Sequence, residues 1–430
     1  MSQPSIAILH YASPPTIGGV ESTIAAHARL FADHGYAVKI ITGHGEPFDP
    51  RVPVQVIPDV GSRSPRVSEV NAELARGIVG EKFQQLVEEL IAELVGQIVV
   101  DPRNSKTLSE ANGEMEGGNL SYIIVHNALS LHKNLALTAA LKNLADAGRI
   151  RLIAWCHDFA WTDPQYAREV HPGFPWDLLR QPWEGVKYVV VSEARKRELQ
   201  ELWGRGVEIA VVPPGLDPLA FLGVTAKTAR WARDFALLDA EPLLLLPARL
   251  TRRKNIEYAM EITAALRERG QAARLVITGP PGPHNPTNVA YLETLRGLRE
   301  TLGLQDAAIF LYEFGAVDDA TLRDLFLLAD ALLFPSEREG FGIPLLEAGL
   351  TRLPTFCSDI APFRESAGEH AHYLPPGQSP PDAAAQIATT LAQDSAYRLK
   401  KRVLREYAWE RVFKERIEPL ILLLEHLHAH

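Results

Sequence analysis

The sequence has little cysteine and no long apolar run. Only two cysteines, Cys156 and Cys357, occur in 430 residues. That number is too small for a disulfide framework, and their spacing is not that of metal ligands, so we expect a reducing, cytoplasmic compartment. No stretch approaches 18 consecutive apolar residues, and Met1–Leu9 lacks the charged and apolar segments of a signal peptide. We therefore expect neither a membrane span nor a secretion signal.

An excess of basic residues is also absent. The chain has 44 Lys and Arg against 53 Asp and Glu, a formal net charge of −9. Such a chain has no general attraction for nucleic acid or for anionic lipid, and we expect neither as a partner. What remains is an ordinary globular composition, 46% apolar and 23% charged, at a length that predicts two or three domains.

Short apolar runs alternate with helical patterns, which indicates parallel β-α-β units. The strands predicted in the first half are Ile6–His10, Val38–Thr42, Tyr122–Val125, Leu152–Cys156 and Tyr188–Val191. Those predicted in the second half are Leu243–Leu246, Arg274–Thr278, Ala308–Leu311, Ala331–Phe334 and Thr355–Cys357. The sequence therefore predicts an α/β protein with two doubly wound domains.

The stretch 46–120 does not follow this alternation. We interpret it as an irregular, partly helical insertion, with amphipathic helix within Glu73–Val99 and an exposed loop at Glu110–Asn119. The predicted domains are residues 1–200, residues 201–400 and a C-terminal helix in 401–430. Because ligands bind beyond the carboxyl ends of the strands in such sheets, functional residues are expected in the loops that follow each strand.

The clearest local signal is the segment from Pro335 to Ala348. Pro344 suits the first position of a helix, which places Gly340 and Gly342 in the preceding loop. Glu339 then lies at the mouth of the loop and Glu347 in the first helical turn. Free N–H groups there form an anion site, and the two carboxylates can bind sugar hydroxyls. The alternative is a plain helix start whose acidic residues are favoured by the helix dipole.

A second signal is a basic loop after the strand Leu243–Leu246. Four cations, Arg249, Arg252, Arg253 and Lys254, fall within six residues of a net acidic chain. Arginine offers a planar donor fork and lysine a point charge, and both suit a diphosphate. The alternative is a solvated basic loop, but its place at the carboxyl end of a strand favours an anion site.

Two weaker signals lie in the first half. Gly18 and Gly19 form the first turn between strand and helix, although they lack the glycine spacing of a dinucleotide-binding motif and fit a plain tight turn equally well. His126-Asn127 and His157-Asp158 follow two neighbouring strands, so both pairs are expected on one rim. No three or four ligands share a usable metal spacing, and no metal site is predicted.

Together these segments resemble glycosyltransferase family 4, the retaining GT-B enzymes. The resemblance is carried by Gly18-Gly19-Val20-Glu21, His157, the loop Arg249–Lys254, the pair Glu339 and Glu347, and Tyr407-Ala408-Trp409-Glu410. It implies two Rossmann-like domains that face each other across a cleft, with a C-terminal helix that crosses back to the first domain. The segments Trp155–Trp161 and Gly279–Pro286 resemble a subgroup that builds small glycosides such as mannosylglucosylglycerate.

The resemblance also implies roles for the residues. Arg249 and Lys254 would hold the nucleotide diphosphate and stabilise it as it leaves, Glu347 would bind the ribose, and Glu339 would contact the donor sugar. The remaining donor contacts would come from Gly340, Phe341, Gly342 and Gly19, and His157 would lie by the transferring sugar. The acceptor would lie near Gly18, His126, Asn127 and Asp158.

The function implied is metal-independent, retaining transfer of a hexosyl group, glucose or mannose, from a nucleoside diphosphate sugar to a small soluble acceptor, with no cofactor. A lipid acceptor is disfavoured because Glu81–Glu93 is acidic, with Lys82 as its one cation. A sugar-nucleotide isomerase or epimerase on the same fold, and a non-catalytic sugar-nucleotide binder, stay open as alternatives.

Overall fold

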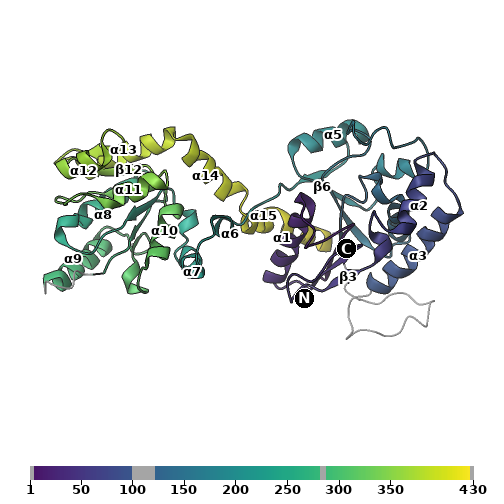
Figure 1. Cartoon of the computed structure of the whole chain (residues 1–430), viewed down its shortest axis with the longest axis horizontal. Coiled ribbons are helices and arrows are strands. Elements are labelled where there is room, and N and C mark those ends of the chain that lie inside the picture. Colours follow the sequence, from purple (N-terminus) through teal and green to yellow (C-terminus); the bar gives the residue numbers. More distant parts are fainter. Residues whose placement is uncertain (1–3, 99–121, 281–286, 427–430) are drawn as a thin grey trace. The chain divides into compact units, whose positions relative to one another are not determined.

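The computed structural model describes residues 4–98, 122–280 and 287–426 (Figure 1). The chain forms two units: Met1–Gly215 with Trp409–His430, and Leu216–Ala408. The predicted boundaries at 200 and 400 were therefore too early. The chain adds another strand to the first sheet after residue 200, and the helix that spans residue 400 belongs to the second unit. The backbone N–H of Leu216 donates to the Tyr407 carbonyl oxygen at 2.8 Å, so the chain enters and leaves the second unit along neighbouring segments.

The first unit contains a seven-stranded parallel sheet in the order β3-β2-β1-β4-β5-β6-β7. Its strands are β1 (Ile6–His10), β2 (Val38–Thr42), β3 (Val54–Val56), β4 (Tyr122–His126), β5 (Arg151–Cys156), β6 (Lys187–Val190) and β7 (Ile209–Val211). All residues of β1 and β4 are buried, because helices cover both faces of a parallel sheet and leave no polar side. The strand order reverses between β1 and β4.

The helices of this unit are α1 (Gly19–Asp33), α2 (Pro65–Leu74), α3 (Glu81–Ile98), α4 (Leu135–Asp146) and α5 (Glu193–Trp203). In α3 the buried residues recur at helical spacing, namely Phe83, Leu86, Val87, Leu90 and Leu94. The prediction of amphipathic helix within Glu73–Val99 is thus confirmed. The description of 46–120 as an insertion was wrong in part, because β3 belongs to the sheet and pairs with β2. The predicted loop Glu110–Asn119 lies outside the described residues.

The C-terminal segment completes the first unit, as predicted. It consists of α15 (Trp409–Val412), a π-helical turn at Phe413–Ile417, and α16 (Glu418–His426). In Figure 1 the yellow α15 lies beside the purple α1. The Phe413 ring packs against Phe31 of α1 with centroids 5.1 Å apart, and Glu418 accepts a hydrogen bond from the Tyr36 hydroxyl at 3.1 Å.

The second unit contains a six-stranded parallel sheet in the order β10-β9-β8-β11-β12-β13. The strands are β8 (Leu243–Leu246), β9 (Arg274–Ile277), β10 (Ala308–Phe310), β11 (Ala331–Phe334), β12 (Thr355–Ser358) and β13 (His372–Leu374). The order reverses between β8 and β11. Each unit thus has the doubly wound, Rossmann-like topology predicted for the domains of a GT-B enzyme.

The helices of the second unit are α6 (Pro218–Leu222), α7 (Ala226–Asp234), α8 (Ile256–Glu268), α9 (Thr287–Thr301), α10 (Asp319–Leu328), α11 (Ile343–Leu350), α12 (Ala361–Ala367), α13 (Pro380–Gln393) and α14 (Ser395–Glu406). Buried Asp330, just before β11, accepts the Leu243 N–H at 2.7 Å and pairs with Lys400 of α14 at 2.9 Å. This contact fixes α14 to the second sheet.

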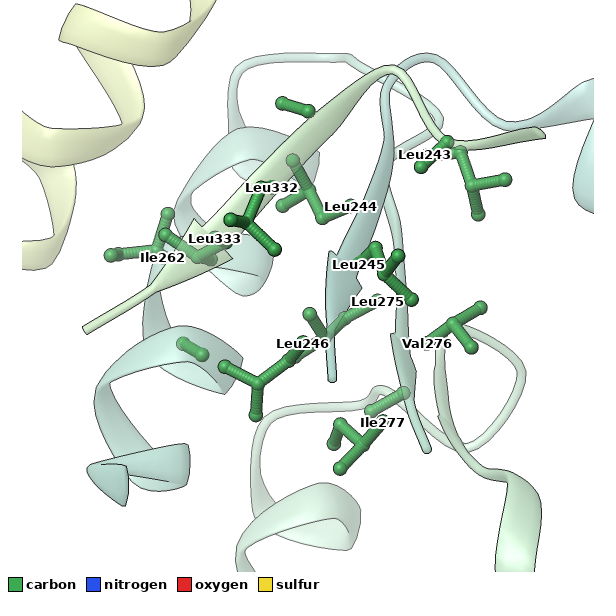
Figure 2. Close-up of a cluster of buried hydrophobic side chains, with 14 of the residues drawn as sticks. Leu243, Leu244, Leu245, Leu246, Ile262, Leu275, Val276, Ile277, Leu332 and Leu333 are labelled. Atoms are coloured by element: carbon green, nitrogen blue, oxygen red, sulfur yellow. The ribbon is translucent and has the colours of Figure 1, made fainter. Parts of the chain in front are cut away.

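The core of the second unit is centred on β8. Figure 2 shows its four leucines among apolar side chains of β9, β11 and α8, namely Leu275, Val276, Ile277, Leu332, Leu333 and Ile262. A strand made only of leucine is stable there because both of its faces are covered. No helix in the described part of the chain is both long enough and apolar enough to span a bilayer.

Candidate functional site

Both sheets place their chemically interesting loops at the point where the strand order reverses. In the second unit the basic loop follows β8 and the segment from Pro335 to Gly342 follows β11, and these two strands are neighbours. In the first unit the Gly18-Gly19 turn follows β1, and His126 ends the neighbouring β4. Loops that follow adjacent strands on opposite sides of a reversal diverge, and the crevice between them is where ligands bind in such sheets.

In the second unit these two loops are joined by a cluster of charges. The Lys254 ammonium pairs with the Glu339 carboxylate, and Arg253 Nη1 donates to the other carboxylate oxygen at 2.9 Å. Arg253 also donates to the Arg338 carbonyl oxygen at 3.1 Å, and its own carbonyl accepts the Glu337 N–H at 2.9 Å. Two cations therefore converge on one carboxylate at the reversal point.

The pair between Lys254 and Glu339 is largely withdrawn from water, with side-chain exposures of 11% and 10%. Burial lowers the pKa of Lys254, because the charged ammonium loses hydration, although the Glu339 carboxylate opposes this. Burial alone would raise the pKa of Glu339, but the hydrogen bond from Lys254, together with the charges of Lys254 and Arg253, lowers it. The ammonium also lies 4.8 Å from the centre of the Phe334 ring. A buried charge held in this way is preorganised toward an anion.

The glycine loop after Glu339 has one position that only glycine can fill. Gly342 has φ of 107°, and a Cβ there would lie 2.8 Å from the Phe363 ring. Gly340 has open space around it and an ordinary φ. The helix α11 starts at Ile343, one residue earlier than predicted, so Glu347 is its fifth residue and not in the first turn. Glu347 is half-buried, and its pKa is raised by burial and then by the charge of Asp319.

The other predicted donor residues are placed less closely. Arg249 is exposed and, in the described part of the chain, has no ion pair or hydrogen bond with Lys254, Glu339 or Glu347. Phe341 is also exposed, at 44%. The residue after Arg249, Leu250, donates its backbone N–H to the Pro280 carbonyl oxygen at 3.1 Å. The start of the predicted Gly279–Pro286 loop thus borders the basic loop, and residues 281–286 lie outside the described residues.

In the first unit the two strand-end histidines meet. His126 Nδ1 lies 3.0 Å from His157 Nε2, and the two rings are stacked with centroids 5.3 Å apart. His126 is completely buried, and its carbonyl oxygen accepts a hydrogen bond from His10 Nδ1 at 2.9 Å. Burial lowers the pKa of His157 to about 4 and that of His126 well below its ordinary value. Both rings are therefore neutral near pH 7.

Asn127 connects these histidines to the following loop. Its φ of 59° is one that asparagine tolerates, and its side-chain oxygen accepts the His157 N–H at 2.8 Å. Asp158 pairs with Arg195 of α5 at 3.3 Å. The His126-Asn127 and His157-Asp158 pairs thus occupy one rim, as predicted.

A cavity of about 670 Å³ opens at this rim. Three of the predicted residues, Gly19, Asn127 and Asp158, are among its lining residues, whereas Gly18, His126 and His157 are not. The completely buried His126 contacts His157 and has no surface left for an acceptor. Within the described residues, no cluster of three or more His, Cys, Asp or Glu side chains has a geometry that could hold a metal ion.

Several residues at these sites were not predicted. Arg253 was recognised only as a member of the basic loop, although it binds the same carboxylate as Lys254. Arg63 and Lys133 line the cavity of the first unit and were not predicted either. Lys133 follows a buried strand at short distance, and that position was the one available hint.

Comparison with known proteins gives a family match over the second unit. Residues 228–410 match the family model described as Glycosyl transferases group 1. An uncharacterized glycosyltransferase of Methanocaldococcus jannaschii is 27% identical over 252 residues, 56% of this chain. A D-inositol 3-phosphate glycosyltransferase of Kineococcus radiotolerans is 30% identical over 48% of the chain, and a mannosylglucosylglycerate synthase of Petrotoga mobilis is 24% identical over 59%.

The matched stretches span 62%, 49% and 65% of those three proteins' own lengths, less than two thirds of each. The family match covers most of the second unit, which is the unit that holds the charge cluster at its strand reversal.

Proposed function

We propose that this protein is a retaining glycosyltransferase that moves a hexosyl group, glucose or mannose, from a nucleoside diphosphate sugar to a small acceptor. The observation that carries the proposal is the buried pair of Lys254 and Glu339, with Arg253, in the unit that matches the glycosyltransferase family. A cation beside a carboxylate at one crevice suits a ligand with a diphosphate next to a sugar: the cation binds the phosphate oxygens, and the carboxylate accepts hydrogen bonds from hydroxyls.

The step breaks the bond between the sugar C1 and the diphosphate oxygen and forms a bond from C1 to an acceptor oxygen. The hydroxyl proton of the acceptor passes to the leaving diphosphate. We assign Lys254 and Arg249 to the negative charge that develops on the leaving group. Fixed charges in a site that excludes water are worth about 10²–10³ in rate for each donor removed.

Glu339 has two roles in this proposal. It holds the Lys254 ammonium in place before the donor arrives, and it then accepts hydrogen bonds from sugar hydroxyls. Gly342 brings the backbone of the loop and the start of α11 to the same place, and Glu347 would take the ribose hydroxyls. In the first unit, Gly19 would lie near the donor phosphate and His157 near the transferring sugar. The acceptor would bind against Asn127 and Asp158.

We expect the reaction to proceed without a divalent metal, because Lys254 and Arg249 supply the positive charge that a metal ion would otherwise provide. Transfer that stops in the presence of a chelator and returns with Mg²⁺ would contradict this part of the proposal.

The test is a donor panel of UDP-glucose, GDP-glucose, ADP-glucose and GDP-mannose with a set of sugar and polyol acceptors. Release of nucleoside diphosphate is measured, and the anomeric configuration of the product is read by NMR. The proposal expects transfer with the donor's configuration retained. An inverted product would refute retention, conversion of the donor without an acceptor would indicate an isomerase, and donor binding without turnover would indicate a binding protein.

A further inference from the structure

Two cavities of the first unit adjoin at the same residues. The cavity of about 670 Å³ at the strand reversal and a second of about 350 Å³ share three lining residues, Ser62, Arg63 and Lys133. The first two precede α2, and Lys133 lies between β4 and α4. Both volumes lie in the range of small-molecule sites. The shared wall therefore presents two cations to any ligand in either cavity.

These two cations are not neutralised by the protein. In the described part of the chain neither Arg63 nor Lys133 has a carboxylate within 4.0 Å, and both side chains are exposed. By contrast Arg66, three residues further on, pairs with Asp59 at 2.9 Å and also with Glu89. The backbone of Lys133 is fixed, because its carbonyl oxygen accepts a hydrogen bond from Asn71 Nδ2 at 2.9 Å. The Lys133 ammonium lies 5.6 Å from the centre of the Tyr166 ring, which holds it without neutralising its charge.

The rest of the larger cavity is suited to hydroxyl groups. His10 lines it, and because His10 Nδ1 donates to the His126 carbonyl oxygen, the neutral ring keeps Nε2 as a hydrogen-bond acceptor. Asn127 adds an amide, and Glu21 and Asp158 add carboxylates. Since Asp158 is paired with Arg195, Glu21 is left as the lining carboxylate without an ion pair among the described residues.

From this arrangement we infer that the acceptor is a hydroxyl compound carrying one anionic group, a carboxylate or a phosphate ester. Arg63 and Lys133 bind the anion, and the polar groups around His10 bind the hydroxyls. Arginine provides two parallel donors for either anion and lysine a point charge. That this ligand is the acceptor rests on the proposed function. The binding of an anion by Arg63 and Lys133 is a separate property of the first unit.

Binding is measured first, on the full chain without any donor. Glycerol 3-phosphate, D-glycerate and glycerol are titrated by isothermal calorimetry into the wild-type protein and into Arg63→Gln and Lys133→Gln. We expect at least one of the two anions to bind and glycerol not to bind. Each substitution should weaken the affinity for the anion by roughly 10- to 100-fold, the range for charge-assisted hydrogen bonds. Preference for one anion over the other identifies the group as phosphate ester or carboxylate.

Two matched controls separate this site from general charge. Arg66→Gln removes a neighbouring arginine that lines neither cavity, and Lys142→Gln removes a lysine of α4 that pairs with Asp146. Both variants should bind the anions within about twofold of wild type, since a screened surface charge contributes little. Anion binding that is unchanged in Arg63→Gln and Lys133→Gln, or lost equally in the two controls, would overturn the inference.

Transfer is measured next, with neutral and anionic acceptors in matched sets such as glucose, gluconate and glucose 6-phosphate. We expect kcat/KM to favour an anionic member, and Arg63→Gln to raise KM for that member more than for glucose. A neutral acceptor used equally well would overturn the inference. If no donor is turned over at all, the proposed function fails, while the calorimetric comparison still decides whether Arg63 and Lys133 form an anion site.

Discussion

Replacing either member of the buried pair between Lys254 and Glu339 should lower stability, but by unequal amounts. In Lys254→Met the Glu339 carboxylate keeps Arg253 at 2.9 Å, and the methionine chain still covers the Phe334 ring. The carboxylate therefore stays paired, and we expect a loss of about 1 kcal/mol or less in the free energy of unfolding. Turnover should fall by about 10²–10³-fold, which is the loss expected from the proposed role of Lys254 in stabilising the leaving diphosphate.

In Glu339→Gln it is the buried cation that loses its partner of opposite charge. Among the described residues Glu339 provides the one carboxylate within ion-pair distance of Lys254, whose side chain is 11% exposed. The ammonium is left buried without a counter-charge, which costs about 3 kcal/mol. The two variants should therefore differ by about 2 kcal/mol in stability, with Glu339→Gln the less stable.

The assay combines urea unfolding followed by circular dichroism with release of nucleoside diphosphate by the same preparations. Arg252→Gln is the control, since this arginine belongs to the same loop but lies over the Tyr291 ring, 4.9 Å from its centre. It should unfold and turn over as wild type does. Wild-type turnover in Lys254→Met would refute the assigned role of Lys254. Equal stability of Lys254→Met and Glu339→Gln would refute the assignment of Arg253 as the remaining partner.

Two further predictions concern buried groups. Burial lowers the pKa of His27 to about 3, whereas the unfolded chain protonates it near 6.5, so acid favours the unfolded state by up to about 1.4 kcal/mol per pH unit below 6.5. Between pH 7 and pH 5, His27→Phe should lose about 2 kcal/mol less stability than wild type in urea titrations; parallel losses would contradict the burial argument. Gly342→Ala should lower the free energy of unfolding by about 1–3 kcal/mol through its positive φ and the contact with Phe363, whereas Gly340→Ala should lie within about 0.5 kcal/mol of wild type. Equal thermal midpoints for the two alanine variants would show that the loop relaxes around the new methyl group.

The strands with continuous apolar runs were predicted within one residue at either end. β1 is apolar up to its last residue, His10, and β8 is all leucine; all of their side chains are buried, so the pattern and the environment agree. The edge strands β3, β7 and β13 were missed. Each is three residues long and only partly buried, so its sequence carries little of the apolar signal that marks a central strand.

The contact between Lys254 and Glu339 could not be predicted from spacing along the chain. The two residues are 85 positions apart, and each was selected from its own loop. What brings them together is the pairing of β8 with β11, which skips β9 and β10. The meeting of His126 with His157 was easier to expect, because the strands before them are consecutive along the chain and adjacent in the sheet.

The cations of the first unit could not be predicted in the same way. Arg63 follows the edge strand β3, and its side chain has no carboxylate within 4.0 Å among the described residues. Charge in a sequence does not reveal whether a partner lies nearby in the fold. Arg66 and Arg63 are alike in sequence context, and only the contacts distinguish them.

The return of Trp409–His430 to the first unit has a consequence for synthesis. Residues 1–215 leave the ribosome before the segment that covers α1 has been translated, and roughly 200 further residues must follow. At the usual rates of translation this takes about 10–40 s. During that time the face of α1 that Phe413 and Ile417 later cover is without its partner. The second unit, a single continuous stretch, is complete earlier. The unit that is synthesised first is therefore the last to close its core, and its nascent chain is the form that most needs protection from aggregation.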